Sequence, residues 1–313
     1  MLTEDQAALL LEQSDVVAIP TETVYGLAAR IDRPEAIEKI FRIKERPSFD
    51  PLIVHVSSIE QAKLYANEWT EIHQKLASQF WPGPLTLVVS KNDKVSTVIT
   101  SGLDSVGLRY PQHLLTLSLI NKIGVPLAAP SANKFGKTSP TTAQHVKESL
   151  PEVEILDGGD CKVGIESTIV SIQNGSSVKV QLLRPGMIQW TQIKEALSGF
   201  QVEFIDSNKK IMAPGNLEDH YMPELPLVLV ETQVAKSELK FKIKEIYKKE
   251  FNNFVELILS KEAVIAAREL YAQLRKLSQS QSDAIYFQVE EYMKNEDWLP
   301  IMDRITKAST FKI

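Results

Sequence analysis

The chain has 313 residues, of which 43% are hydrophobic and 24% are charged, and its formal net charge is −5. These values indicate a soluble globular protein of one large or two medium domains, and the negative balance argues against broad, nonspecific binding to nucleic acid. The single cysteine, Cys161, excludes an internal disulfide framework and a cysteine-based metal site, so we expect a reducing compartment. No apolar run approaches the roughly 20 residues that span a bilayer, and residues 1–13 show an acidic amphipathic pattern rather than a basic signal peptide.

Polar residues follow the first expected strand. A helix over 4–14 leads into the apolar run Val16–Pro20, whose length and β-branching favour a buried strand. Thr21–Gly26, with the sequence TETVYG, comes next. Polar groups at the C-terminal end of a strand occupy the usual ligand position in open α/β sheets. The threonines are also explained as turn caps, which are common.

Two cations stand on a rigid turn in the next stretch, FRIKERPSFDPLIVHV. Helical spacing predicts a helix over 34–44, and Pro47 ends it because proline lacks an amide hydrogen and restricts the residue before it. Lys44 and Arg46 therefore lie at the end of this helix, ahead of a short apolar strand that carries His55. The pattern is compatible with an anion site, but by itself this stretch favours a solvated pair of cations that complements the helix dipole.

Several helices and strands are expected between residues 58 and 130. In chain order they are helical patterns over 58–79, a stiff turn at 81–84, strands over 85–89 and 106–109, a helix over 113–122 and a strand over 126–130. The strand over 106–109 ends in Arg109, and the last strand opens into Ser131 and Asn133. Polar groups thus stand again at strand ends.

The remaining chain predicts the end of one domain, a linker and a second domain. The first part contains a loop with Ser139, a helix to Leu150, strands over 169–172 and 178–183 around a hairpin turn at 174–175, and a helix over 189–198. The second of these strands runs into Arg184. Residues 206–226 show little periodicity and favour a linker. Strand and helix patterns then alternate over 227–313, which predicts a small α/β unit with a parallel sheet.

Cations and small polar side chains share one kind of position, where a strand or a helix meets a loop. The cations are Lys44, Arg46, Arg109 and Arg184, and the polar residues are Ser131, Asn133, Ser139 and Ser167. If these junctions share one edge of the sheet, they form a pocket suited to a triphosphate, since guanidinium groups grip phosphate oxygens. The P-loop and Rossmann glycine fingerprints are absent from the sequence. The residues by themselves therefore indicate an anion pocket without naming its ligand.

Four motifs at ordered spacing carry more information together than any one alone. They are PTETVYGLA at 20–28, KERPSFDPLIVH at 44–55, PSANKFGKTSPT at 130–141 and ESTIV at 166–170. With them the chain resembles the YrdC-type threonylcarbamoyl-AMP synthases in their longer, two-domain form, strongly over about 1–190 and weakly over the C-terminal third. The resemblance implies a YrdC-like, twisted, open mixed α/β sheet with flanking helices over 1–205, a linker or lid over 206–226, and a smaller Rossmann-like α/β domain over 227–313.

An enzymatic reaction follows from this resemblance. It implies a nucleotidyltransferase that condenses L-threonine, bicarbonate or carbon dioxide, and ATP into threonylcarbamoyl-AMP and pyrophosphate. Magnesium is expected with the ATP, and no separate metal site is expected in the protein. The product serves the N6-threonylcarbamoyladenosine modification of tRNA beside the anticodon, and a separate tRNA-transfer complex receives it. The resemblance further implies a cytoplasmic protein that has no membrane partner and binds tRNA weakly at most.

The resemblance also implies roles for the individual residues that match the family's motifs. The resemblance implies that L-threonine contacts Thr23, His55, Arg109, Ala129 and Ser167. It implies that ATP contacts Arg46, Asp50, Ser105, Ser131, Asn133, Ser139, Arg184 and Tyr221. Lys44 and Arg46 are the expected catalytic residues, because they would stabilise charge on the transition state and on the leaving pyrophosphate. No general base is assigned.

Two departures from the family pattern bear on the nucleotide site. Asp50 stands where the family commonly has asparagine, which places a negative charge near the phosphates. We expect this carboxylate to bind either magnesium or a backbone amide. The family's linker folds over the nucleotide, which implies a lid over 213–223 that includes Tyr221. Asn216–Asp219 replace the basic residues that this linker often carries, so a passive tether stays an alternative.

Two other functions compete with the synthase. The same fold has been linked to RNA binding, so a non-catalytic RNA-binding module is one alternative; the sequence pI of about 5.7 and the lack of a basic stripe with interleaved aromatics disfavour it. A related carbamoyl-transfer enzyme of hydrogenase maturation is the other. The absence of acylphosphatase-like and zinc-finger segments, with one cysteine in the chain, disfavours that enzyme.

Overall fold

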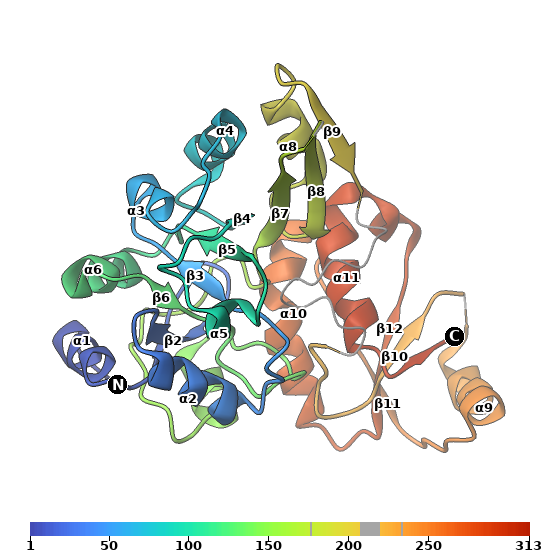
Figure 1. Cartoon of the computed structure of the whole chain (residues 1–313). Coiled ribbons are helices and arrows are strands. Elements are labelled where there is room, and N and C mark those ends of the chain that lie inside the picture. The colour runs from blue at the N-terminus through green and yellow to red at the C-terminus, as the bar shows by residue number, and fades with distance from the viewer. Residues whose placement is uncertain (176, 207–219, 233) are drawn as a thin grey trace. The chain divides into compact units, whose positions relative to one another are not determined.

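The computed structural model describes residues 1–175, 177–206, 220–232 and 234–313 (Figure 1). These residues form two compact units. The first contains Met1–Phe135 and the described part of 140–206, and the second contains Gly136–Ser139 and the described part of 220–313. A short piece of a loop in the N-terminal half therefore belongs with the C-terminal unit. The lid predicted over 213–223 lies outside the described residues except for its last four positions.

A twisted, mixed sheet organises the first unit (Figure 1). Within the described residues it has nine strands, which are, in order across the sheet, β1 (Val17–Ile19), β2 (Gly26–Arg30), β6 (Leu127–Ala128), β3 (Ile53–His55), β5 (Ser105–Arg109), β4 (Leu85–Ser90), β7 (Thr168–Gln173), β8 (Val178–Arg184) and β9 (Val202–Ile205). Three neighbouring pairs are parallel, namely β3 with β5, β4 with β7, and β8 with β9, and the others are antiparallel. The expected open mixed sheet is confirmed.

Helices flank this sheet. Those of the first unit are α1 (Glu4–Glu12), α2 (Pro34–Lys44), α3 (Ile59–Lys63), α4 (Glu71–Phe80), α5 (Thr97–Thr100), α6 (Leu114–Ile123), α7 (Ala143–Ser149) and α8 (Trp190–Ala196). The helix α2 ends at Lys44 because Glu45 adopts a left-handed conformation, with φ of 54°, two residues before the proline that was expected to stop it.

The two faces of the sheet are covered differently. On one face, alternate residues such as Val54, Leu87 and Leu108 join the large apolar core. On the other face, α1 and α6 pack with residues of β1, β2 and β6 in a second apolar cluster. The neighbouring strands carry a small cluster on this second face, formed by Ile53, Ile169, Leu183 and Val88. Because side chains alternate along a strand, His55, Arg109, Ser105 and Thr86 project from this second face too.

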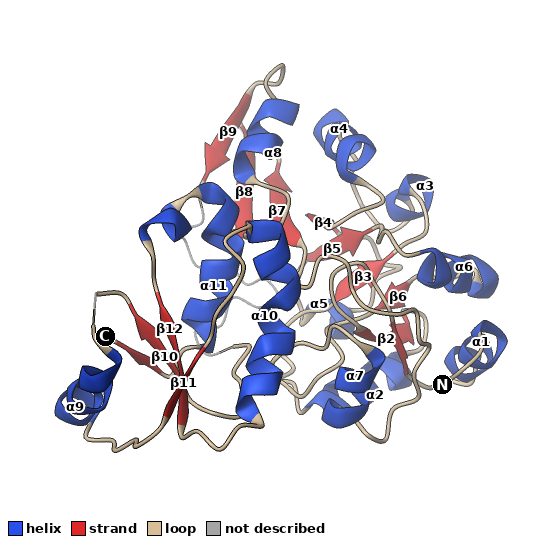
Figure 2. Ribbon diagram, turned by 180° about the vertical axis from the view of Figure 1, so that it is seen from behind, coloured by secondary structure: helices blue, strands red, loops and turns tan. Residues whose placement is uncertain are grey.

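The second unit is built on a smaller sheet, seen from behind in Figure 2. Its strands among the described residues, in order, are β11 (Phe254–Glu256), β12 (Ala284–Gln288), β10 (Leu227–Val230) and β13 (Phe311–Lys312), and all neighbouring pairs are parallel, as expected. Its helices are α9 (Lys236–Tyr247), α10 (Ala263–Ser278) and α11 (Leu299–Ala308), with short 3-10 helices at Glu291–Lys294 and Glu296–Trp298. Across the described part of the chain, every helix is too short or too polar to cross a membrane.

Candidate functional site

Arg109 is the centre of a buried polar group on the second face of the larger sheet. It is the last residue of β5 and lies in register with His55, the last residue of β3. Its Nη2 atom donates a hydrogen bond of 2.9 Å to Thr23 Oγ1 and lies 2.9 Å from Glu22 Oε2. The Arg109 and Glu22 side chains are 5% and 3% exposed, so this ion pair is screened little by water.

The loop that carries Glu22 and Thr23 is held by its own backbone and side chains. Thr21 Oγ1 donates to the carbonyl of Val24 at 2.6 Å, as in the turn-capping interpretation of the threonines. The Val163 amide donates to the Glu22 carbonyl at 2.7 Å, and the Gly164 amide donates to the Thr23 carbonyl at 3.1 Å. The polar side chains therefore project from a fixed main chain.

Ala129 lies against the same loop. A Cβ atom on Gly26 would stand 3.1 Å from the Ala129 Cβ, so the two small residues let β2 and the end of β6 approach closely. The Ala129 amide donates to the Ile53 carbonyl at 3.0 Å, which fixes it beside β3. Ala129 thus lies between β2 and β3, in the apolar cluster that includes residues of α1 and α6.

His55 is held as a neutral imidazole. Its side chain is buried, and burial together with the adjacent Arg109 charge lowers its pKa to about 3. At neutral pH it therefore offers one donor and one acceptor rather than a positive charge.

Ser167 joins Arg184 and a residue that the sequence did not single out. Arg184 donates from Nε to the Ser167 carbonyl and from Nη2 to Ser167 Oγ, both at 3.1 Å. The hydroxyls of Ser167 and Thr86 are 2.7 Å apart. Ser167 was expected to contact threonine and Arg184 to contact the nucleotide, and the structure shows the two side chains in direct contact.

Lys44 ties the end of α2 to the loop after β6. Its Nζ atom donates to the carbonyls of Ser131, at 2.6 Å, and Asn133, at 2.5 Å. The Phe135 amide donates back to the Lys44 carbonyl at 2.8 Å. Burial, and secondly the positive charge of Arg46, place the Lys44 pKa well below its ordinary value. The residues Lys44, Ser131 and Asn133, which were expected to act together, do meet.

Arg46 and Asp50 form a second buried ion pair. Arg46 Nη2 lies 2.8 Å from Asp50 Oδ2, and both side chains are 5% exposed. Arg46 also donates to the carbonyls of Asp50 and Pro51, at 3.1 and 3.0 Å. Burial raises the Asp50 pKa, while the charges of Arg46, Lys44 and Arg184 act in the opposite direction. Asp50 thus has an arginine as its partner, which differs from the magnesium or backbone amide considered from sequence.

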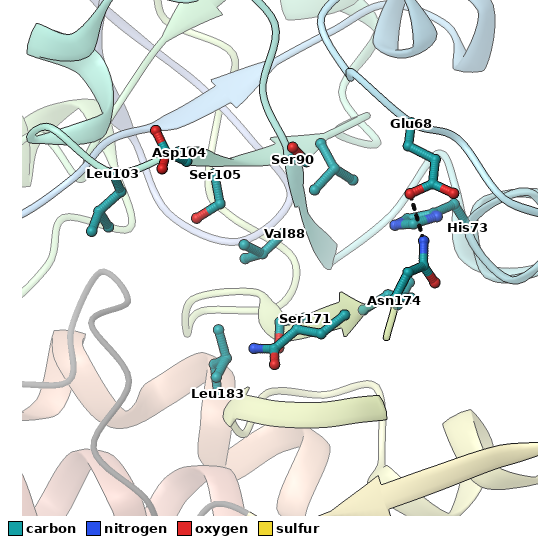
Figure 3. Close-up of a pocket in the computed structure, with 13 residues that line it drawn as sticks. Glu68, His73, Val88, Ser90, Leu103, Asp104, Ser105, Ser171, Asn174 and Leu183 are labelled. Atoms are coloured by element: carbon teal, nitrogen blue, oxygen red, sulfur yellow. Dashed lines mark hydrogen bonds between the residues drawn. The ribbon is translucent and has the colours of Figure 1, made fainter. Parts of the chain in front are cut away.

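A pocket of about 660 Å³ opens over β4, β5, β7 and β8 (Figure 3). Leu103, Asp104 and Ser105 lie at one end, and Glu68, His73 and Asn174 lie at the other. Val88, Ser171 and Leu183 line the stretch between the two ends. Asn174 Nδ2 donates to Glu68 Oε2 at 2.7 Å. Ser105 is the expected nucleotide residue in this pocket, and its lining includes Leu183, next to Arg184 in the chain.

Ser139 and Tyr221 belong to the second unit. The Met222 amide donates to the Gly136 carbonyl at 2.7 Å, and the Thr138 amide donates to the Met222 carbonyl at 3.2 Å. The Tyr221 ring stacks on Tyr271, with centroids 5.8 Å apart. Tyr221 is 1% exposed and has a positive φ of 66°, so both its side chain and its backbone are constrained.

The first unit therefore gathers its predicted residues into four contacting sets and a pocket. The sets are Thr23 with Arg109, Ser167 with Arg184, Lys44 with the Ser131–Asn133 loop, and Arg46 with Asp50. The sequence analysis did not identify Glu22 or Thr86, nor the end of the pocket that Glu68, His73 and Asn174 line. For Glu22 and Thr86 a signal existed, since each is a polar residue in or beside an otherwise apolar strand sequence. No group of three or more His, Cys, Asp or Glu side chains that could hold a metal ion occurs within the described residues.

Comparisons with known proteins agree with this fold. The Sua5/YciO/YrdC family model, described as telomere recombination, matches residues 9–186, and a model described as threonylcarbamoyl-AMP synthase, C-terminal domain, matches residues 188–310. The threonylcarbamoyl-AMP synthase of Pyrococcus abyssi is 38% identical over 98% of this chain and 94% of that protein. The synthase of Bacillus subtilis is 44% identical over 72% of this chain and 66% of that protein.

A solved structure extends the likeness to three dimensions. The crystal structure of P. abyssi Sua5 complexed with L-threonine matches with a TM-score of 0.85 and 34% identity, covering 100% of this chain and 97% of that one. The resemblance drawn from the four motifs is thereby confirmed. Because one family model covers more than half of the chain and a relative 38% identical aligns with nearly all of it, the chain belongs to the Sua5/YciO/YrdC family.

Proposed function

We propose that this protein is a threonylcarbamoyl-AMP synthase, which joins L-threonine, bicarbonate or carbon dioxide, and ATP and releases pyrophosphate. The observation that carries the proposal is the presence of two buried cation groups, around Arg109 and around Lys44 and Arg46, in a chain that matches a synthase over 98% of its length. A group that binds the amino-acid carboxylate and a group that binds phosphate together suit a reaction that joins the carbamate of an amino acid to AMP.

The Arg109 group is the proposed threonine subsite. Arg109 offers its guanidinium to the substrate carboxylate, Thr23 and the neutral His55 offer hydrogen bonds, and Ala129 bounds the side-chain space. Ser167 links this subsite to Arg184. The P. abyssi relative has been crystallised in complex with L-threonine, which supports a threonine site in this chain.

The Lys44 and Arg46 groups form the proposed phosphate subsite. In its protonated form Lys44 has three N–H donors, of which two bind carbonyls, so the third is proposed to bind a phosphate oxygen. Arg46 and Arg184 supply guanidinium charge as pyrophosphate leaves, and Ser131 and Asn133 orient the phosphates. Magnesium is expected to enter with ATP and to neutralise phosphate charge, held mainly by phosphate oxygens and water.

The pocket of Figure 3 is the proposed adenosine subsite. Its volume lies within the usual range for small-molecule sites. A strand rises about 3.3 Å per residue, so Ser105 lies roughly 13 Å along β5 from Arg109, a separation that suits ATP lying along the sheet. Asp50, Ser139 and Tyr221 are proposed as further nucleotide residues.

The product is a mixed anhydride that water destroys, so a separate tRNA-transfer complex is the proposed next partner. Its proposed acceptor is the adenosine beside the tRNA anticodon, and the proposed location is the cytoplasm, where ATP and tRNA occur together. Tight tRNA binding by this chain is not part of the proposal, because its formal net charge is −5.

Pyrophosphate release tests the proposal. The protein is incubated with ATP, magnesium, bicarbonate and L-threonine, and then with each component omitted in turn. We expect release that requires threonine and bicarbonate together, and less release with L-valine, which lacks the hydroxyl. Salt-sensitive tRNA binding without threonine-dependent release would instead support an RNA-binding module.

A further inference from the structure

Glu22 is a buried carboxylate whose bonding capacity is not used up. The residue is 4% exposed. Apart from the ion pair with Arg109, neither of its carboxylate oxygens receives a hydrogen bond from the residues that the structure describes. A carboxylate accepts several hydrogen bonds, and a buried one that lacks them is costly. The carboxylate can therefore still accept a hydrogen bond from a donor that a ligand supplies.

Backbone hydrogen bonds hold Glu22 at this buried position. Its own carbonyl accepts from the Val163 amide, and the next carbonyl, of Thr23, accepts from the Gly164 amide. Thr23 Oγ1 accepts from the same guanidinium that faces Glu22. The backbone of Glu22 is therefore held in place, and its carboxylate lies against Arg109 in the proposed threonine subsite.

The charges of this pair match those of an amino acid. Arg109 and Glu22 together are neutral, and so is an amino-acid zwitterion. If a substrate carboxylate binds Arg109 and an ammonium group binds Glu22, each buried charge gains an opposite partner and the site stays neutral. A carboxylate ligand without an ammonium group would instead bring a second negative charge toward Glu22.

We propose that Glu22 binds the ammonium group of the substrate, so that the Glu22–Arg109 pair selects a zwitterionic α-amino acid. This inference rests on the proposed threonine subsite and adds the residue that recognises the amine. It makes Glu22 a specificity-determining residue rather than a counter-ion whose sole task is to orient Arg109.

A ligand comparison separates these two roles. L-Threonine and (R)-3-hydroxybutanoate share the carboxylate, the hydroxyl and the methyl group, and the second lacks the amine. Their dissociation constants are measured by calorimetry on the full chain, for the wild type, for Glu22→Gln, and for Glu12→Gln, which removes an exposed charge from α1. We expect Glu22→Gln to weaken threonine about 10- to 100-fold, the usual effect of losing a charged hydrogen bond. Binding of the analogue should change less than about 3-fold or become tighter, and Glu12→Gln should alter neither ligand.

Equal weakening of both ligands by Glu22→Gln would overturn the inference and leave Glu22 as a support for Arg109. If Glu22→Gln does not fold, Glu22→Asp keeps the charge but withdraws it by one methylene, and the same selective loss of threonine is expected. A wild-type protein that binds threonine no better than the analogue also overturns the inference. The pyrophosphate assay distinguishes that result from failure of the proposed function, because it reports the synthase reaction whichever residue recognises the amine.

Discussion

Arg46 has both a structural and a proposed chemical role, and substitutions can separate them. Arg46→Ala removes a phosphate ligand and also leaves Asp50 buried without its ion-pair partner. We expect turnover to fall roughly 100-fold, as for other transition-state donors. We also expect the free energy of unfolding to fall by about 3–5 kcal/mol, the usual effect of breaking a buried pair from one side. Steady-state kinetics and urea unfolding measure the two effects.

The double variant Arg46→Ala/Asp50→Ala is the matched control. It removes the orphaned carboxylate together with its partner, so much of the lost stability should return. Turnover should stay low, because the phosphate contact is still missing. If turnover recovered together with stability, Arg46 would be a structural residue, and the phosphate subsite would need another cation.

His55 should resist protonation over the range in which an ordinary histidine titrates. Its pKa is lowered to about 3 by burial and by Arg109, whereas an unfolded chain has a value near 6.5. Between these values the unfolded state binds more protons, so stability is lost as the pH falls below about 6.5, by at most about 1.4 kcal/mol per pH unit for this residue. The imidazole Cε1–H resonance, assigned with His55→Gln, should not shift between pH 8 and pH 5. A midpoint near 6.5 would show that the ring is exposed.

At the residue scale, sequence motifs predicted much of the site but not how its members are bonded. Lys44 was expected beside Ser131 and Asn133, and it reaches them through their carbonyls rather than their side chains. The hydroxyl contact between Thr86 and Ser167 joins residues 81 positions apart. Such a partner depends on which strands become neighbours, which local periodicity does not encode.

The turn after β8 is an element on which the site depends. A Cβ atom on Gly186 would stand 2.4 Å from the Thr168 amide nitrogen and 2.8 Å from the Ser167 carbonyl carbon, and backbone cannot move aside cheaply. We expect Gly186→Ala to destabilise the protein by about 1–3 kcal/mol, as overpacking does, and to weaken threonine binding by displacing Ser167. Thermal unfolding and calorimetry measure these effects.

Gly199 provides the comparison for Gly186. It lies in the exposed turn after α8, and a Cβ atom there would have no heavy atom within 4 Å. Gly199→Ala should therefore change stability by less than about 0.5 kcal/mol and leave threonine binding unchanged. If the two variants behaved alike, close packing at Gly186 would not be what positions Ser167.

Element types followed from the sequence more readily than their arrangement. Hydrophobic periodicity placed α2 and most strands within a few residues, and it predicted the parallel sheet of the second unit. The end of α2 was expected from Pro47, but the left-handed Glu45 turns the chain earlier. The parallel pairing of β4 with β7 joins segments about 80 residues apart, so the order across the sheet could not be read from local pattern.

At the scale of the whole molecule, four buried cations occur where positive charge is proposed to act. The chain is acidic overall, yet Lys44, Arg46, Arg109 and Arg184 are all buried around the proposed site. Each of the four contacts a carboxylate or a carbonyl in the structure, so the charges are positioned before any ligand arrives. This preorganisation favours catalysis by orientation and charge stabilisation rather than by covalent participation of the protein.

Incorporation of labelled bicarbonate tests the central claim most directly. The wild-type protein is incubated with ATP, magnesium, L-threonine and ¹³C-bicarbonate, and the nucleotides are separated at once and analysed by mass spectrometry. The proposed reaction predicts an adenylate that contains both threonine and the ¹³C atom, formed in step with pyrophosphate and absent when threonine is omitted. Pyrophosphate accompanied by an unlabelled threonyl adenylate, or AMP without any carbamoylated intermediate, would contradict it.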